Sequence, residues 1–160
     1  MSSTSVITQE MRDSIGVDYE PVTHTVELGA IRVFAEAIGD PNPIYTNQLV
    51  ALETRHAGIE APPTFLRSLT PTPPRLPFRV PYRGLLDGGS EWEYIGPPVR
   101  PGDRITVTTR IADLRERTGQ LGAMLFTVLE TRFEDQAGAV VALERNTIIH
   151  YRSSEQETQS

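Results

Sequence analysis

The chain has 160 residues, a formal net charge of −6, three histidines, no cysteine and, since all fifteen basic residues are arginine, no lysine. This composition excludes a thiol nucleophile, a disulfide framework, a thiolate zinc site, and a Schiff-base or P-loop lysine. The length fits one domain, and the acidic balance gives no general attraction to nucleic acid or to anionic membranes.

The ends of the chain and its apolar runs set the expected organisation. Residues 1–14 and 153–160 are polar and are expected to be flexible, which leaves residues 15–152 as one domain. No apolar run approaches the ~20 residues of a membrane-spanning helix. The first residues lack the basic and apolar regions of a signal peptide, so we expect a cytoplasmic protein.

The first half of the chain predicts short helices after one strand. Residues 22–27 alternate between apolar and polar and indicate a strand. One helix follows because apolar side chains recur at helical spacing, namely Ile31, Phe34, Ala35 and Ile38. Gly39 is placed to end this helix. A weaker helix is predicted over residues 47–54.

A third short helix and a proline-rich segment complete the first half. The helix covers residues 65–69, with Thr64 as its N-cap. The stretch 71–81 holds five prolines and is expected to be an extended surface segment.

The second half of the chain predicts an antiparallel sheet. Alternating or continuous apolar patterns indicate strands at residues 90–95, 104–111, 124–133 and 139–151. Proline and glycine turns separate them. Helices followed by a long meander predict an α+β fold, in which a helix packs on a curved sheet.

One loop concentrates the chemistry. In the segment 34–45, Asp40 comes directly after the helix-ending Gly39, and Pro41 and Pro43 brace the loop around it. A turn or capping role explains a carboxylate at this position equally well.

The segment 34–45 also resembles the signature of the MaoC-like (R)-specific enoyl-CoA hydratases and hydroxyacyl dehydratases, in which Gly-Asp-x-Asn-Pro is followed by an apolar residue and histidine. Residues 85–94 and 98–103 resemble that family's first long strand and its Arg-Pro-Gly-Asp turn. Residues 61–65 resemble the N-terminal-type, fatty-acid-synthase-like dehydratase domains. The resemblance covers residues 18–152 and implies a hot-dog fold, a curved antiparallel sheet wrapped around a helix.

The resemblance implies hydration of 2-enoyl thioesters, or the reverse dehydration, with no metal or redox cofactor. In the family an aspartate and a histidine activate the water, and a backbone N–H at the start of the central helix polarises the thioester carbonyl. Carried over to this chain, the catalytic candidates are Asp40, Asn42 and Tyr45, and Tyr45 stands where the family has histidine.

This sequence departs from the family pattern at two points. Tyrosine has an ordinary pKa about 3.5 units above that of histidine, a gap worth roughly 4.8 kcal/mol, so Tyr45 is a poor proton acceptor at neutral pH. The start of the central helix carries Pro62 and Pro63, and proline has no N–H to donate. The N–H of Thr64 is the alternative donor.

These departures favour a degenerate half-site that pairs with a second, catalytic MaoC-like chain and shapes the acyl tunnel. The alternatives are a self-sufficient homodimer that uses Asp40, a non-catalytic acyl-CoA-binding subunit, and a hot-dog thioesterase. The ligand is then an acyl-CoA or acyl-carrier-protein thioester.

Candidate substrate-binding residues follow from the same reasoning. Pro63 and Thr64 stand at the start of the central helix, Trp92 is a candidate lining for the acyl chain, and Arg55 and Arg83 are candidates for the CoA phosphates. Core packing for Trp92 and surface exposure for the arginines are the simpler explanations. His56 is a candidate replacement base, or else an ordinary loop residue.

Overall fold

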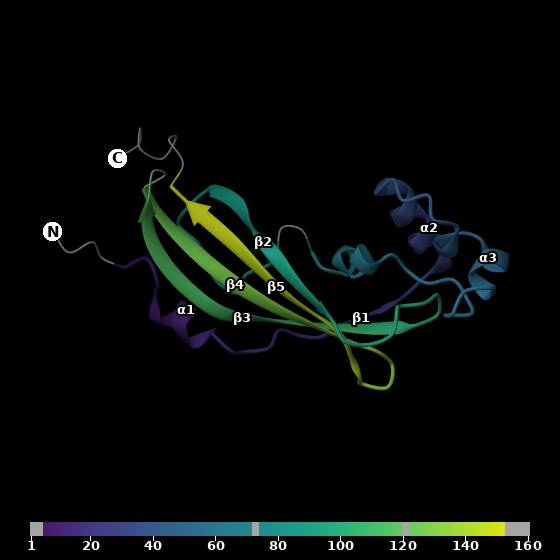
Figure 1. Cartoon of the computed structure of the whole chain (residues 1–160). Helices are drawn as coiled ribbons and strands as arrows, with labels where there is room; N and C mark the ends of the chain where they lie inside the picture. Colours follow the sequence, from purple (N-terminus) through teal and green to yellow (C-terminus); the bar gives the residue numbers. More distant parts are fainter. Residues whose placement is uncertain (1–4, 72–73, 120–121, 153–160) are drawn as a thin grey trace.

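A computed structural model describes residues 5–71, 74–119 and 122–152 of the chain. One five-stranded antiparallel sheet dominates it, in the order β1-β3-β4-β5-β2 (Figure 1). The strands are β1 (Val22–Thr25), β2 (Gly84–Tyr94), β3 (Arg104–Gly119), β4 (Gly122–Glu134) and β5 (Val140–Tyr151). The helices are α1 (Gln9–Asp13), α2 (Leu28–Ala37), η1 (Pro43–Tyr45), α3 (Gln48–Leu52) and η2 (Pro63–Leu69), where η marks a 3₁₀ helix.

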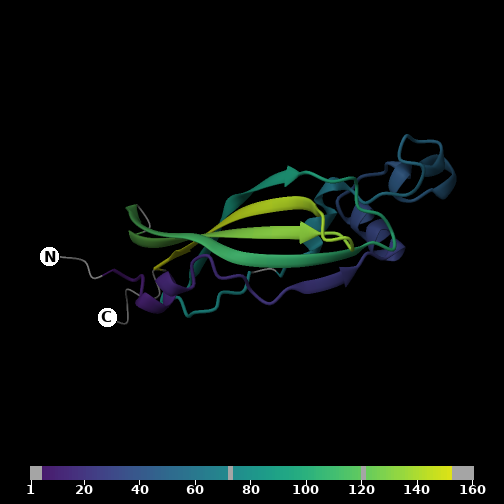
Figure 2. The ribbon, with the colours of Figure 1, turned by 90° about the horizontal axis from the view of Figure 1, so that it is seen from below.

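The helices lie at different places along the curved sheet. Both ribbon views show α2 and α3 together at one end, and α1 near the other end (Figures 1 and 2). The segment over the concave face is η2, whose Arg67 lies within 3.9 Å of Glu144 on β5. The predicted α+β architecture is confirmed. The helix that covers the concave face is a 3₁₀ helix of seven residues.

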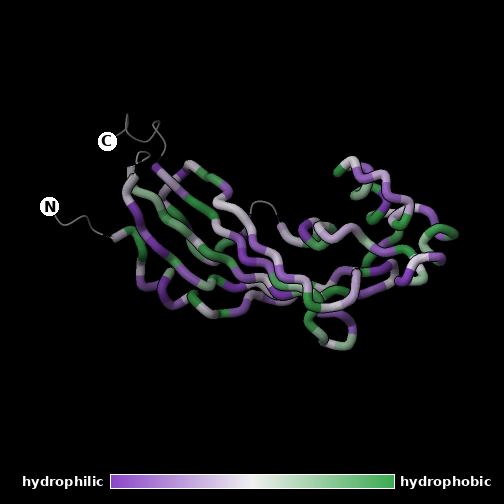
Figure 3. The backbone as a smooth tube through the Cα atoms, viewed as in Figure 1, coloured by the Kyte–Doolittle hydropathy of each residue, from purple (hydrophilic) through white to green (hydrophobic). Residues whose placement is uncertain are grey.

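Hydrophobic and hydrophilic residues alternate along the long strands (Figure 3), as their period of two requires. The apolar positions form two buried clusters. The first surrounds Phe133 and includes Ile31 and Ala35 from α2, and the second surrounds Leu125 and Met11. The sheet therefore has a separate core at each end.

Two strands extend further than their patterns predict. β3 continues from the expected residue 111 to Gly119, and β2 begins at Gly84 instead of residue 90. The register of each strand shifts at a bulge, between Ile111 and Asp113 in β3 and between Asp87 and Ser90 in β2. A bulge changes which side chains face inward, so alternation counted along the sequence loses its phase there.

The expected flexibility of residues 1–14 is wrong for part of this range. Residues 1–4 and 153–160 lie outside the described residues, but Gln9–Asp13 form α1 and Met11 is only 2% exposed. The hydroxyl of Thr8 caps this helix by accepting from the Met11 N–H at 3.2 Å. Met11 in the second cluster, with Val6 and Ile7 packed against that cluster, anchors this segment to the sheet.

The predicted N-cap at Thr64 is also wrong. The 3₁₀ helix η2 begins at Pro63, with Pro62 in the capping position, because proline suits the first position of a helix. In the proline-rich stretch, residues 72–73 lie outside the described residues. Beyond them, alternate side chains pack against the second cluster, namely Leu76, Phe78, Val80 and Tyr82.

Helix α2 ends in a motif that sets the position of the following loop. The N–H of Gly39 donates to the Glu36 carbonyl and the N–H of Asp40 to the Ala35 carbonyl, both at 3.0 Å. This is a Schellman motif, and Gly39 takes the positive φ of +70° that the motif needs. The predicted helix end at Gly39 is confirmed, and it fixes the backbone of Asp40.

We expect Gly39→Ala to lower the free energy of unfolding by about 1–2 kcal/mol, because an alanine is strained at positive φ. The matched control is Gly29→Ala within α2, where an added Cβ meets nothing within 4 Å. That change is expected to raise stability by about 0.4–1 kcal/mol. Urea unfolding measures the free energy of unfolding of both variants. If both changes shift it in the same direction, the Schellman motif at Gly39 is contradicted.

Candidate functional site

The Asp40 carboxylate sits in a tight turn. Its Oδ1 accepts from the Asn42 N–H at 3.0 Å, and Asn42 Oδ1 in turn accepts from the Ile44 N–H at 3.2 Å. Asn42 therefore caps η1, which is a structural role. Asp40 is partly buried and lines a shallow depression of about 420 Å³ beside Arg32 and Glu36.

Tyr45 is buried, with only 7% of its surface exposed. Burial raises the pKa of its hydroxyl above the ordinary value, and the negative charges of Asp40 and then Glu60 raise this pKa further. Tyr45 and Glu60 line a second cavity of about 300 Å³, against Pro62 and Pro63, whereas Asp40 opens onto the other depression. Tyr45 is thus a proton donor at neutral pH and cannot take over the work of a histidine base.

The start of η2 has few hydrogen-bond donors. Pro62 is buried, and Pro63 and Thr64 are exposed. The Phe65 N–H donates to the Pro62 carbonyl at 2.8 Å, so the first N–H of the helix available to a ligand is that of Thr64.

The remaining predicted residues do not gather around Asp40. Trp92 stacks against Tyr94 and Phe133, at ring distances of 5.9 and 5.4 Å, and so packs the first core cluster. Arg55 is exposed and donates to Nε2 of its neighbour His56 at 2.9 Å. His56 Nδ1 faces the Glu60 carboxylate at 3.7 Å.

Arg83 lies at the far end of the molecule. It precedes β2, whose eleven residues span on the order of 30 Å, and the opposite end of β2 reaches the cavity of Tyr45. Within one chain, Arg83 and Asp40 do not share a site.

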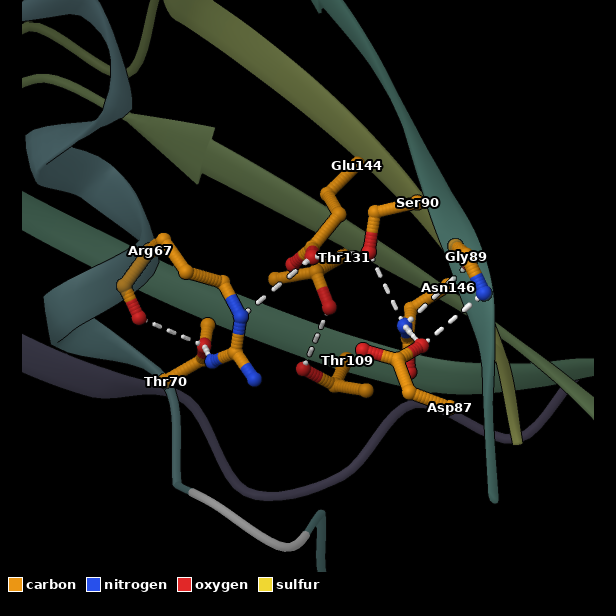
Figure 4. Close-up of polar contacts among 9 residues, drawn as sticks. All are labelled: Arg67, Thr70, Asp87, Gly89, Ser90, Thr109, Thr131, Glu144 and Asn146. Atoms are coloured by element: carbon orange, nitrogen blue, oxygen red, sulfur yellow. Dashed lines mark hydrogen bonds and ion pairs between the residues drawn. The ribbon is translucent and has the colours of Figure 1, made fainter. Parts of the chain in front are cut away.

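A cavity of about 610 Å³ lies between η2 and the concave face of the sheet. A row of polar side chains crosses its floor, because Thr109, Thr131 and Glu144 are direct neighbours on β3, β4 and β5. The Thr109 and Thr131 hydroxyls lie 3.0 Å apart. Arg67 reaches down from η2 toward Glu144 (Figure 4).

Glu144 is a buried carboxyl group, 4% exposed. Its Oε1 accepts from Ser90 Oγ at 3.1 Å and lies 3.9 Å from Arg67 Nε. Burial raises the pKa of Glu144, while Arg67 and the Ser90 hydrogen bond lower it to a smaller extent, and Asp87 adds a minor upward contribution. The pKa of Glu144 therefore lies above its ordinary value, because desolvation outweighs the two favourable partners.

Asn146 holds the bulge of β2 against β5. Its Nδ2 donates to Ser90 Oγ at 2.9 Å, and to the Gly89 carbonyl and Asp87 Oδ1 at 3.3 Å each (Figure 4). This amide therefore fixes the position of Ser90 against Glu144.

Comparison with known proteins assigns the chain to a family. The model of the FAS1-like dehydratase domain region matches residues 13–144. The chain belongs to the FAS1-like dehydratase domain family. The predicted hot-dog fold and the MaoC-like, N-terminal-type resemblance are thereby confirmed.

Individual relatives agree with this assignment. A UPF0336 protein of Streptomyces avermitilis is 37% identical over 133 residues, which cover 78% of this chain and 83% of the relative. A probable enoyl-CoA hydratase alpha subunit of Thermomonospora curvata is 28% identical over 82% of this chain, which spans 47% of that subunit. The HadBC (3R-hydroxyacyl-ACP dehydratase) complex of Mycobacterium tuberculosis has a similar fold, with a TM-score of 0.71 and 22% identity over 86% of this chain and 97% of that one.

The residues of the concave cavity in this FAS1-like dehydratase domain were not predicted from the sequence. A signal for them was present in β5, where Ala142, Glu144, Asn146 and Ile148 share one face at the period of a strand. A carboxylate and an amide between apolar residues on an inward face indicate a polar site inside the fold.

Two general properties concern the described residues as a whole. Within them, no group of three or more histidine, aspartate or glutamate side chains is arranged to hold a metal ion. No helix in this part of the chain is long and apolar enough to cross a membrane.

We expect the buried Glu144 to make stability fall as pH rises. Because its pKa is raised in the folded chain, the folded state holds the Glu144 proton at pH values where the unfolded state has released it. The free energy of unfolding of the wild type should therefore fall relative to Glu144→Gln as pH increases above about 4.5. Denaturant unfolding of both proteins between about pH 4 and 7 measures the difference, and a rising trend would contradict desolvation as the main cause.

Proposed function

We propose that the chain is one subunit of a hydro-lyase that hydrates 2-enoyl thioesters or dehydrates (R)-3-hydroxyacyl thioesters. In this proposal the Asp40 loop is a degenerate half-site, and a second hot-dog chain with an intact aspartate and histidine performs the proton transfers. The observation that carries it is Tyr45, buried and with a raised pKa, at the position of the family's histidine.

The reaction explains why this substitution matters. Water adds its oxygen to C3 of the enoyl thioester, the double-bond electrons move toward the thioester carbonyl, and C2 then takes up a proton. The step needs a base for the water and a donor for the developing oxyanion. Tyr45 does not supply the base, and Pro63 leaves only the Thr64 N–H at the start of η2 as donor.

Strand β2 supports a paired assembly. It is an edge of the sheet, and nine of its eleven residues are exposed. Leu85, Leu86 and Tyr94 on this strand are exposed apolar side chains. A long, unprotected edge strand is a template for pairing with another strand, so β2 is the surface where we place the second hot-dog chain. A complex of related fold and a relative named as an alpha subunit are consistent with this arrangement.

The concave cavity supports an acyl-binding role for this subunit. Its volume of about 610 Å³ falls within the usual range of small-molecule sites, and apolar side chains from β1, β3, β4 and η2 line much of it, namely Val22, Val107, Leu129 and Leu69. We assign the acyl chain of the thioester to this cavity and the thioester itself to the partner's side of the interface.

We expect the purified chain alone to hydrate trans-2-enoyl-CoA substrates at a negligible rate. A complex with a MaoC-like chain that carries the intact Gly-Asp-x-Asn-Pro-x-His motif should turn them over. In that complex, Asp40→Asn should lower kcat/KM less than about tenfold, whereas losing the partner's motif histidine should cost about 10²–10⁴-fold. The loss of absorbance of the enoyl thioester measures the rate.

Controls separate the alternatives. Glu36→Gln removes a charge from the same depression as Asp40 and is the matched control for Asp40→Asn. If the lone chain turns the substrates over at the full rate and Asp40→Asn abolishes this activity, a self-sufficient homodimer replaces this proposal. Release of free CoA from a saturated acyl-CoA would instead indicate a thioesterase.

A further inference from the structure

A proline-rich segment, residues 74–83, leads from the concave cavity to the start of β2. Alternate side chains of this segment pack against the second core cluster, namely Leu76, Phe78, Val80 and Tyr82. The residues between and beside them are exposed, namely Arg75, Pro77, Arg79, Pro81 and Arg83. Arginine and proline therefore alternate along the outer side of one anchored segment. We call Arg75, Arg79 and Arg83 the arginine ridge.

The arginine ridge carries positive charge that the described residues leave without partners. None of its three guanidinium groups forms an ion pair or a hydrogen bond with another described residue. Between Glu60 and Asp87 the sequence has four arginines and no acidic residue, although the chain as a whole carries a net charge of −6. An exposed positive ridge on an acidic protein attracts a negatively charged partner to this one place.

The prolines limit the shapes that the ridge can take. Proline restricts φ and has no N–H, so Pro77 and Pro81 reduce the conformations of the segment and cannot donate to a neighbouring strand. The inward side chains hold the same segment on the second core cluster. A surface that is already held in place loses little conformational entropy when a partner docks on it.

We propose that the arginine ridge is the docking surface for an acidic acyl carrier protein, which brings the acyl group that this subunit binds. This inference rests on the proposed function, because it names the carrier of the thioester. Arg75, at one end of the ridge, lines the concave cavity in which we place the acyl chain. Arg83, at the other end, directly precedes β2, where we place the second hot-dog chain. A carrier on the ridge lies next to both.

The surroundings of the ridge favour an acidic protein over other anions. Small ligands such as CoA bind in concave sites, whereas Arg79 and Arg83 stand on the exposed side of a segment packed over a core cluster. A long nucleic acid would also meet the rest of the surface, and the acidic balance of the chain repels it. A folded carrier protein can place a group of carboxylates on the ridge alone.

The test is isothermal titration calorimetry of the full chain with two probes that share one acyl group, a bacterial dodecanoyl acyl carrier protein and dodecanoyl-CoA. We expect Arg79→Gln to weaken binding of the carrier protein about two- to fivefold, and Arg79→Gln together with Arg83→Gln about tenfold. The affinity for dodecanoyl-CoA should change less than twofold. Raising NaCl from about 50 to about 300 mM should weaken carrier binding more in the wild type than in the double variant, because salt screens exposed charges.

Two control variants separate the charge of the ridge from its structure. Arg104→Gln removes an exposed arginine at the start of β3, beside β1 and the first core cluster, and should leave carrier binding unchanged. Arg79→Lys keeps the positive charge and should keep the affinity within about twofold of wild type. Urea unfolding should give the same free energy of unfolding for all variants, because these guanidinium groups have no partner in the part of the chain that the structure describes.

The two probes distinguish failure of this inference from failure of the proposed function. If the chain binds dodecanoyl-CoA but not the carrier protein, or if the double variant binds the carrier as tightly as wild type, the inference is overturned and the proposed function stands. Equal weakening of both probes also overturns it, because the ridge then binds the phosphates of a small ligand. If neither probe binds, the acyl-binding role in the proposed function is overturned together with this inference.

Discussion

The covering of the concave face by a short 3₁₀ helix is the constraint on which the rest of the structure depends. Prolines stand at both ends of η2 and limit it to seven residues, since Pro62 precedes it, Pro63 is its first residue and Pro71 follows it. So short a helix cannot fill a sheet whose longest strand has sixteen residues. The space left between η2 and the sheet is a cavity of about 610 Å³ with polar side chains on its floor.

Pro63 also bears on the degenerate half-site that we propose at the Asp40 loop. Pro63 removes a backbone donor where the family uses one, and Tyr45 replaces the histidine close to it. In the function that we propose, the chain lacks functional groups on the side of the thioester and offers a large volume on the side of the acyl chain. A division of labour between two hot-dog chains is the arrangement in which both features are useful, because one partner can bind what the other converts.

Features set by local interactions could be predicted, and features that depend on register could not. The end of α2 at Gly39 followed from helical spacing and one glycine, and the structure confirms it. The extension of β3 to Gly119 was missed because a bulge after Ile111 changes the phase of the alternation. The burial of Met11 was missed because three apolar residues in a short polar segment, Val6, Ile7 and Met11, give only a weak periodic signal.

For this protein the sequence by itself determined the fold class, the family and the loop around Asp40, because these depend on residues that are neighbours along the chain. Only the tertiary structure decided that Tyr19, Arg67 and Glu144 face one cavity. These residues come from a segment before β1, from η2 and from β5, and the pairing of distant strands brings them together. The tertiary structure also decided that the pKa values of Tyr45 and Glu144 are raised, because desolvation depends on which side chains surround a group rather than on which residues precede it.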